Sequence, residues 1–150
     1  MQPLPHHYNV AMSVRPGDPV KLRTAELPEI ESTPPKEFGG SGTRWSPEGL
    51  FTAAIADCIV LNFQAIAANS KFSWTGLEGT TSAVLDRVEG KMRFTRFDTH
   101  ITLVIPTGAD PARARLLLER AEATCPLSNT LNCEKHLTID IMASSLPMSA

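Results

Sequence analysis

The segment that most constrains the fold is "SPEGLFTAAIADCIVLNFQAIAANS", residues 46–70. Ser46 is a favoured N-cap residue, Pro47 suits the first helical position and Glu48 suits the positive end of a helix dipole. The sequence therefore predicts a helix over this segment. Its apolar residues cover nearly the whole circumference: Leu50, Phe51, Ile55, Ile59, Leu61, Phe63 and Ile66. Such a helix is buried on most sides, which requires a sheet, or a sheet and a second subunit, around it.

The segments before this helix predict a short antiparallel hairpin. Residues 8–14 alternate apolar and polar side chains, as in a half-buried strand. The apolar positions are Val10, Met12 and Val14. Residues 15–19, "RPGDP", have the composition of a turn, and a second strand is expected from Val20. Residues 27–45 are rich in proline and glycine and predict a long loop.

The segments after the helix complete an α+β pattern. Residues 75–105 predict two strands around "RVEGKM", and a second helix follows with Asp110 as its cap and Pro111 in its first turn. The side chains expected to face inward from this helix are Leu116, Leu117, Ala121 and Thr124. Residues 135–143 predict a final strand. The order β-β-α-β-β-α-β indicates mainly antiparallel sheets wrapped around the long central helix.

Composition and charge exclude several classes of protein. The 150 residues suit a single domain over 1–150. The formal net charge is −2 and the basic residues are scattered, so no nucleic-acid partner is expected. No apolar run approaches the ~20 residues that span a bilayer, and no membrane association is expected. The first ten residues lack the pattern of a secretory signal, so the expected location is cytoplasmic.

Three cysteines, Cys58, Cys125 and Cys133, are the main candidates for chemistry. Their odd number, without a CxxC pair or a zinc spacing, argues against a disulfide framework or a metal site, and no cofactor is expected. Each cysteine alone is adequately explained as a small buried hydrophobe. Cys58 and Cys125 lie on the two predicted helices, however. They form a redox pair if packing brings their Cα atoms within ~7 Å.

Two motifs resemble those of the OsmC/Ohr family of thiol-dependent organic hydroperoxide reductases. "PPKEFGGSGTRWSPEGLFTAAIADC", residues 34–58, is similar to a family signature in which an "ELGG"-type stretch leads into "NPEQLFAAGYAAC". The ten-residue spacing from Glu48 to Cys58 matches the spacing in the family. "ATCPLSNTL", which contains Cys125, resembles the family's "CPYSN"-like motif. With the order of elements, the resemblance extends over residues 8–143.

The resemblance implies a peroxidase in which two thiols have different roles. Cys58 would be the nucleophile that attacks the peroxide and becomes a sulfenate, with release of an alcohol. Cys125 would then form a disulfide with it, which an external dithiol such as dihydrolipoamide reduces. Pro126 follows Cys125 directly, so we expect a frayed helix end at which the second thiol can move.

The resemblance also implies a cation beside the buried peroxidatic thiol. The family uses an arginine from the first hairpin, oriented by the glutamate at the start of the helix, which is Glu48 here. Arg15 occupies the matching turn. The turn in the family is glycine-rich, whereas Pro16 follows here, so Arg23 and Arg44 remain alternatives.

Residues near Cys58 are relevant to which substrate binds and to whether the protein has a different function. Phe51, Ile55 and Ile59 are expected to bind the tail of an organic hydroperoxide. Asp57 stands where the family has a small residue, and a carboxylate there would slow the thiol chemistry if it touched the sulfur. Cys133 matches no family motif and is expected to be structural. The alternative is a protein with this fold that binds a small ligand or performs other thiol chemistry.

The family resemblance and the length of the helix together predict an intertwined homodimer. Glu48 and Cys58 are ten residues apart, which is ~15 Å along a helix axis. One arginine side chain would struggle to touch both within a single chain. If two such helices cross antiparallel at a two-fold axis, Glu48 of one subunit approaches Cys58 of the other.

Overall fold

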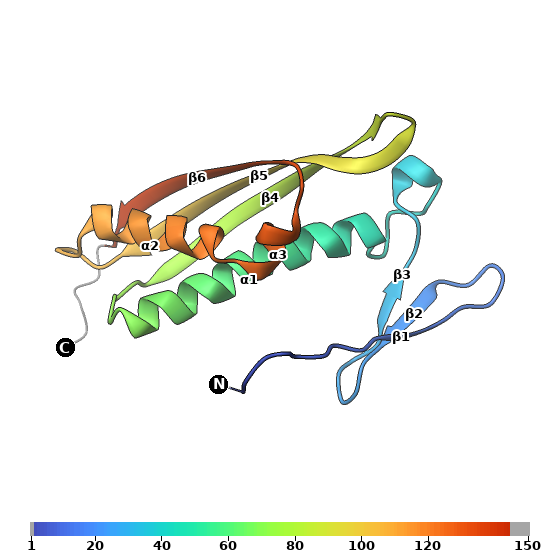
Figure 1. The fold of residues 1–150 in the computed structure, drawn as a ribbon, viewed down its shortest axis with the longest axis horizontal. Coiled ribbons are helices and arrows are strands. Elements are labelled where there is room, and N and C mark those ends of the chain that lie inside the picture. Colours follow the sequence, from blue (N-terminus) through green and yellow to red (C-terminus); the bar gives the residue numbers. More distant parts are fainter. Residues whose placement is uncertain (1, 145–150) are drawn as a thin grey trace. The chain divides into compact units, whose positions relative to one another are not determined.

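The computed structural model describes residues 2–144, which form two compact units divided between Phe51 and Thr52. In the first unit, β1 (Ala11–Ser13), β2 (Val20–Arg23) and β3 (Ile30–Ser32) form an antiparallel sheet in the order β1-β2-β3 (Figure 1). A short 3-10 helix, η1 (Lys36–Phe38), follows. The two predicted strands of the hairpin are therefore present. The prediction of one domain over 1–150 stays a prediction.

Two details of the first unit differ from the sequence-based prediction. Strand β3 and helix η1 lie inside the segment 27–45, which was expected to be a loop; β3 forms because it pairs with β2, Ile30 opposite Leu22. The alternating side chains of residues 8–14 are exposed rather than half-buried, with Met12 79% exposed. The alternation is there, but no element of the first unit covers that face.

The long helix α1 (Pro47–Asn69) begins and ends as the sequence predicts. The Ser46 side chain caps it, because its Oγ accepts the backbone N–H of Gly49 at 3.1 Å. Only one stripe of the helix is buried in the single chain: Ile55, Ile59, Phe63 and Ala67. Leu61, on another face, is 54% exposed. The expectation of burial on most sides is therefore not met within one chain.

By length and composition, α1 is also the one helix among residues 2–144 that could cross a membrane, with a mean hydropathy of 1.7 over its most apolar window. The prediction that no apolar run approaches the ~20 residues that span a bilayer is wrong by this criterion. The core helix of a folded domain meets the same criterion, and the buried stripe of α1 lies in such a core.

The second unit is a three-stranded sheet with helices on one face (Figure 1). Strands β4 (Gly76–Val88) and β5 (Lys91–Ile105) form a long antiparallel hairpin. Glu89 and Gly90 join them with φ of 51° and 80°, as a tight hairpin turn requires. Strand β6 (Glu134–Ala143) adds to β5 in parallel, which differs from a wholly antiparallel sheet. The parallel pairing follows from the helical crossover between these strands.

That crossover consists of α2 (Pro111–Ala123) and a short helix, α3 (Pro126–Thr130), which the sequence did not predict. Asp110 caps α2 as expected, since its carboxylate accepts the N–H of Ala112 at 2.9 Å. The buried residues of α2 are Ala114, Leu117, Leu118 and Ala121. Leu116 and Thr124, which were expected to face inward, are exposed. The α+β class and the long central helix are confirmed.

Candidate thiol site

The structure brings two of the predicted site residues together. The Cys125 thiol lies 2.7 Å from the sulfur of Cys58, to which it donates a hydrogen bond across 67 residues of sequence. Both cysteines are free thiols, and the distance exceeds the ~2.05 Å of a disulfide bond. Cys58 lies in the middle of α1 and is half-buried, whereas Cys125 is fully buried. Only a small movement of either sulfur is needed to join them.

The backbone around Cys125 is more ordered than a frayed helix end. Helix α2 stops at Ala123, and Pro126 starts α3, of which Cys125 is the N-cap. The Cys125 sulfur accepts the backbone N–H of Ser128 at 3.4 Å. The expectation of a loose helix terminus is therefore wrong: proline initiates a second helix here, because its fixed φ suits a first helical position.

Burial raises the pKa of the Cys125 thiol, and its hydrogen bond to Cys58 raises that pKa further. The N–H donated by Ser128 acts in the opposite direction, because it favours the charged sulfur. At neutral pH Cys125 is thus a protonated thiol held against its partner.

Asn62 links the helix that carries Cys58 to the end of α2. Its Nδ2 donates to the carbonyl oxygen of Ala121 at 2.7 Å and to Oγ1 of Thr124 at 2.8 Å. Asn62 is one helical turn beyond Cys58, and Thr124 directly precedes Cys125. These two hydrogen bonds therefore fix the spacing between the segments that carry the thiols.

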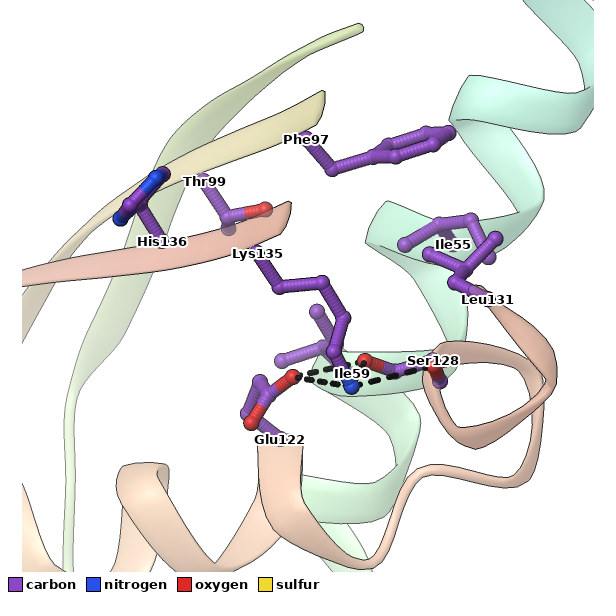
Figure 2. Close-up of a pocket in the computed structure, with 9 residues that line it drawn as sticks. All are labelled: Ile55, Ile59, Phe97, Thr99, Glu122, Ser128, Leu131, Lys135 and His136. Atoms are coloured by element: carbon purple, nitrogen blue, oxygen red, sulfur yellow. Dashed lines mark hydrogen bonds and ion pairs between the residues drawn. The ribbon is translucent and has the colours of Figure 1, made fainter. Parts of the chain in front are cut away.

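A small pocket is lined by Ser128, whose N–H donates to the Cys125 sulfur, and is polar on one side (Figure 2). Ser128 Oγ donates to Oε1 of Glu122 at 2.6 Å. The Lys135 ammonium donates to the carbonyl oxygen and Oγ of Ser128, at 3.2 and 3.3 Å, and lies 3.6 Å from Glu122 Oε1. We call these three residues the Glu122–Ser128–Lys135 cluster. No local sequence motif marks these residues, because they come from α2, α3 and β6, and only the parallel pairing of β6 brings them together.

The remaining residues predicted near the first thiol have different environments. Ile55 and Ile59 are each 2% exposed and line the apolar side of the same pocket. Phe51 is partly exposed on α1, and Asp57 is exposed beside Cys58. Cys133 is half-buried and packs against the core, and its structural role stays a prediction. That Phe51, Ile55 and Ile59 bind substrate stays a prediction.

The candidate arginines and Glu48 belong to the first unit. Arg15 lies in the β1–β2 turn, where its carbonyl oxygen accepts the N–H of Asp18 at 3.0 Å. Arg23 pairs with Glu29, and Arg44 pairs with Glu31 at 2.7 Å. Glu48 lies in the first turn of α1. Across residues 2–144, no three His, Cys, Asp or Glu residues are grouped so that they could hold a metal ion.

The family model for OsmC-like proteins matches residues 40–140. This match covers more than half of the chain and includes both Cys58 and Cys125. The chain belongs to the OsmC-like protein family.

Two named relatives agree with this assignment. The organic hydroperoxide resistance protein of Xanthomonas axonopodis pv. citri is 28% identical over 109 residues, which are 71% of this chain and 74% of that protein. Peroxiredoxin OsmC of Escherichia coli is 28% identical over 107 residues, 71% of each chain. The relatives are thus named for hydroperoxide resistance and for peroxidase chemistry.

Solved structures share the fold. An OsmC-like protein of unknown function from Vibrio cholerae superposes with a TM-score of 0.80 at 15% identity, covering 89% of this chain and 99% of that one. An organic hydroperoxide resistance protein OsmC from Legionella pneumophila gives a TM-score of 0.70 at 24% identity, covering 92% and 99%. At these identities the likeness concerns the fold alone.

Proposed function

We propose that this protein is a thiol-dependent peroxidase that reduces organic hydroperoxides to alcohols. The observation that carries the proposal is the 2.7 Å approach of the Cys58 and Cys125 sulfurs, which come from two different helices. Both cysteines lie within the residues that the family model matches. A half-buried and a fully buried free thiol in contact are otherwise an unusual way to fill a core, because apolar side chains pack there without reactivity.

The reaction consumes one hydroperoxide and two thiols. The Cys58 thiolate attacks the terminal peroxide oxygen, the O–O bond breaks, and the alkoxide leaves and takes a proton to become an alcohol. Cys58 is then a sulfenic acid. The Cys125 thiolate attacks that sulfur and displaces hydroxide, which leaves as water and gives the Cys58–Cys125 disulfide. An external dithiol reduces the disulfide by thiol–disulfide exchange and becomes a disulfide itself.

Arg15 is our candidate for the cation that stabilises the Cys58 thiolate, with Glu48 orienting it. The exposed ion pairs support this choice among the three arginines. Arg23 and Arg44 each have a carboxylate partner, whereas within residues 2–144 the Arg15 guanidinium pairs with none. An arginine without a carboxylate partner keeps its donors for a substrate or a thiolate.

We further propose an organic rather than an inorganic peroxide as substrate, a lipoyl-type dithiol as reductant, a cytoplasmic location and a homodimer. The apolar residues Phe51, Ile55 and Ile59 around this part of α1 support the first point, because they favour an alkyl tail. The family resemblance supports the dithiol and the homodimer.

A stoichiometric assay with cumene hydroperoxide tests the proposal. One equivalent of hydroperoxide should remove two thiols per chain and yield one equivalent of cumyl alcohol, and dihydrolipoamide should restore both thiols. Hydrogen peroxide at equal concentration should react more slowly. If the hydroperoxide is not consumed and the thiol count stays at three, the peroxidase assignment fails and the ligand-binding alternative takes its place.

A further inference from the structure

The Glu122–Ser128–Lys135 cluster holds a backbone N–H, that of Ser128, which donates to the Cys125 sulfur. Ser128 is 1% exposed, and its N–H points at that sulfur. Its hydroxyl donates to Glu122, and both its hydroxyl and its carbonyl oxygen accept from Lys135 (Figure 2). The N–H, hydroxyl and carbonyl groups of Ser128 are thus all hydrogen-bonded, either to the Cys125 thiol or to the partly buried Glu122–Lys135 ion pair. This arrangement leaves Ser128 little freedom to move.

We propose that Glu122, Ser128 and Lys135 are positioning residues for the resolving thiol: they hold the Ser128 N–H on the Cys125 sulfur and so favour its thiolate. This inference rests on the proposed peroxidase function. The thiolate is the form that attacks the Cys58 sulfenic acid, and it is also the form in which Cys125 leaves when a dithiol attacks the disulfide at Cys58.

The full burial of Cys125 explains why its thiolate needs neighbouring hydrogen-bond donors. Burial opposes the charge on sulfur, so Cys125 depends on local donors to ionise. A hydrogen bond that is donated to a charged sulfur inside a protein is stronger than one to a neutral sulfur. Lys135 also favours the Cys125 thiolate through Ser128. Its ammonium holds Ser128 in place and lies on the same side of the pocket as Ser128. The titratable groups around the thiol and the pocket are Cys58, Glu122, Lys135 and His136.

The first test does not depend on peroxidase activity. In a Cys58→Ser, Cys133→Ser background Cys125 is the one remaining thiol, and its ionisation is followed against pH by thiolate ultraviolet absorbance. Lys135→Met should move the midpoint upward by about one pH unit, and Ser128→Ala should move it in the same direction. Lys135→Arg should restore the parent midpoint. Lys91→Met, which removes an exposed lysine from the β4–β5 hairpin, is the matched control and should have no effect.

The second test measures the cycle with all three cysteines present. After one equivalent of cumene hydroperoxide, Lys135→Met should form the Cys58 sulfenic acid at the parent rate and close the disulfide about tenfold more slowly. A dimedone adduct should therefore accumulate on Cys58.

Unchanged midpoints in both Lys135→Met and Ser128→Ala, with the fold intact by thermal unfolding, would overturn the proposal. If the parent protein does not react with hydroperoxide at all, the proposed function fails, and the titration still decides whether the cluster controls Cys125.

Discussion

At the scale of single residues, the two thiols in contact should have unequal roles. Cys58→Ser should abolish hydroperoxide reduction, because it removes the nucleophile. Cys125→Ser should allow one oxidation and then stall with a sulfenic or further oxidised Cys58. Cys133→Ser should keep activity near that of the wild type. The measurement is consumption of cumene hydroperoxide with dihydrolipoamide as reductant, and equal damage from Cys133→Ser and Cys125→Ser would show that the wrong resolving thiol was chosen.

The candidate arginines can be separated by the reactivity of Cys58. Arg15→Ala should slow alkylation of Cys58 by about tenfold at neutral pH, because a nearby cation favours the thiolate. Arg23→Ala and Arg44→Ala, which lose arginines already paired with carboxylates, serve as controls and should react like the parent. An unchanged rate for Arg15→Ala would remove this residue from the site.

The sequence was sufficient to find the two thiols but not the groups that surround Cys125. Cys58 and Cys125 stand in two local motifs, each recognisable without the fold. Glu122 and Lys135 look like ordinary surface charges in the sequence. They meet over Ser128 only because β6 pairs with β5 in a register that sets Lys135 opposite Phe97. The register between strands that are far apart in the sequence cannot be predicted from the residues of either strand alone.

At the scale of elements, the spacing of α1 and α2 should control how readily the disulfide closes. Asn62→Ala removes both hydrogen bonds to the end of α2 and leaves the buried Ala121 carbonyl without this donor. We expect a loss of about 1–2 kcal/mol in the free energy of unfolding and slower disulfide closure. Gln64→Ala, an exposed amide on the same helix, is the matched control. Equal unfolding free energies for the two variants in urea would contradict this account.

The helices were predicted correctly where the residues that cap them lie next to them in the sequence. Ser46 and Asp110 cap their helices through side-chain hydrogen bonds that the sequence predicts directly. Prediction failed for β3 and α3, which have three and five residues and depend on neighbours. Strand β3 forms by pairing with β2, and α3 continues a turn that Cys125 caps. Segments this short have little intrinsic stability, so tertiary contacts decide their conformation.

At the scale of the whole molecule, we predict a homodimer. Helix α1 is apolar nearly all round, yet one chain buries a single stripe of it and leaves Leu61 exposed. The side chains at Val10, Met12 and Val14 are exposed as well. Surfaces of this kind are typical of faces that a second subunit covers. Sedimentation equilibrium should give twice the chain mass of 16.3 kDa, and a monomer at micromolar concentration would contradict the prediction.

The dimer also predicts where Glu48 acts. Co-expression of Glu48→Ala with Cys58→Ser chains gives a heterodimer, which is purified and assayed. If Glu48 of one chain serves Cys58 of the other, both lesions fall in one site and about half the activity returns, because the other site is intact. If Glu48 serves the thiol of its own chain, each site carries one lesion. Activity no greater than that of the separate mutants would then reject the trans placement.

Peptide mapping after one oxidation shows whether Cys58 and Cys125 form the redox couple. The protein is treated with one equivalent of cumene hydroperoxide, its remaining thiols are blocked, and it is digested without reduction for mass spectrometry. We predict one cross-linked peptide pair joining Cys58 to Cys125, with Cys133 recovered as a blocked thiol. A disulfide that includes Cys133, or three blocked thiols after the hydroperoxide has been consumed, would contradict the account.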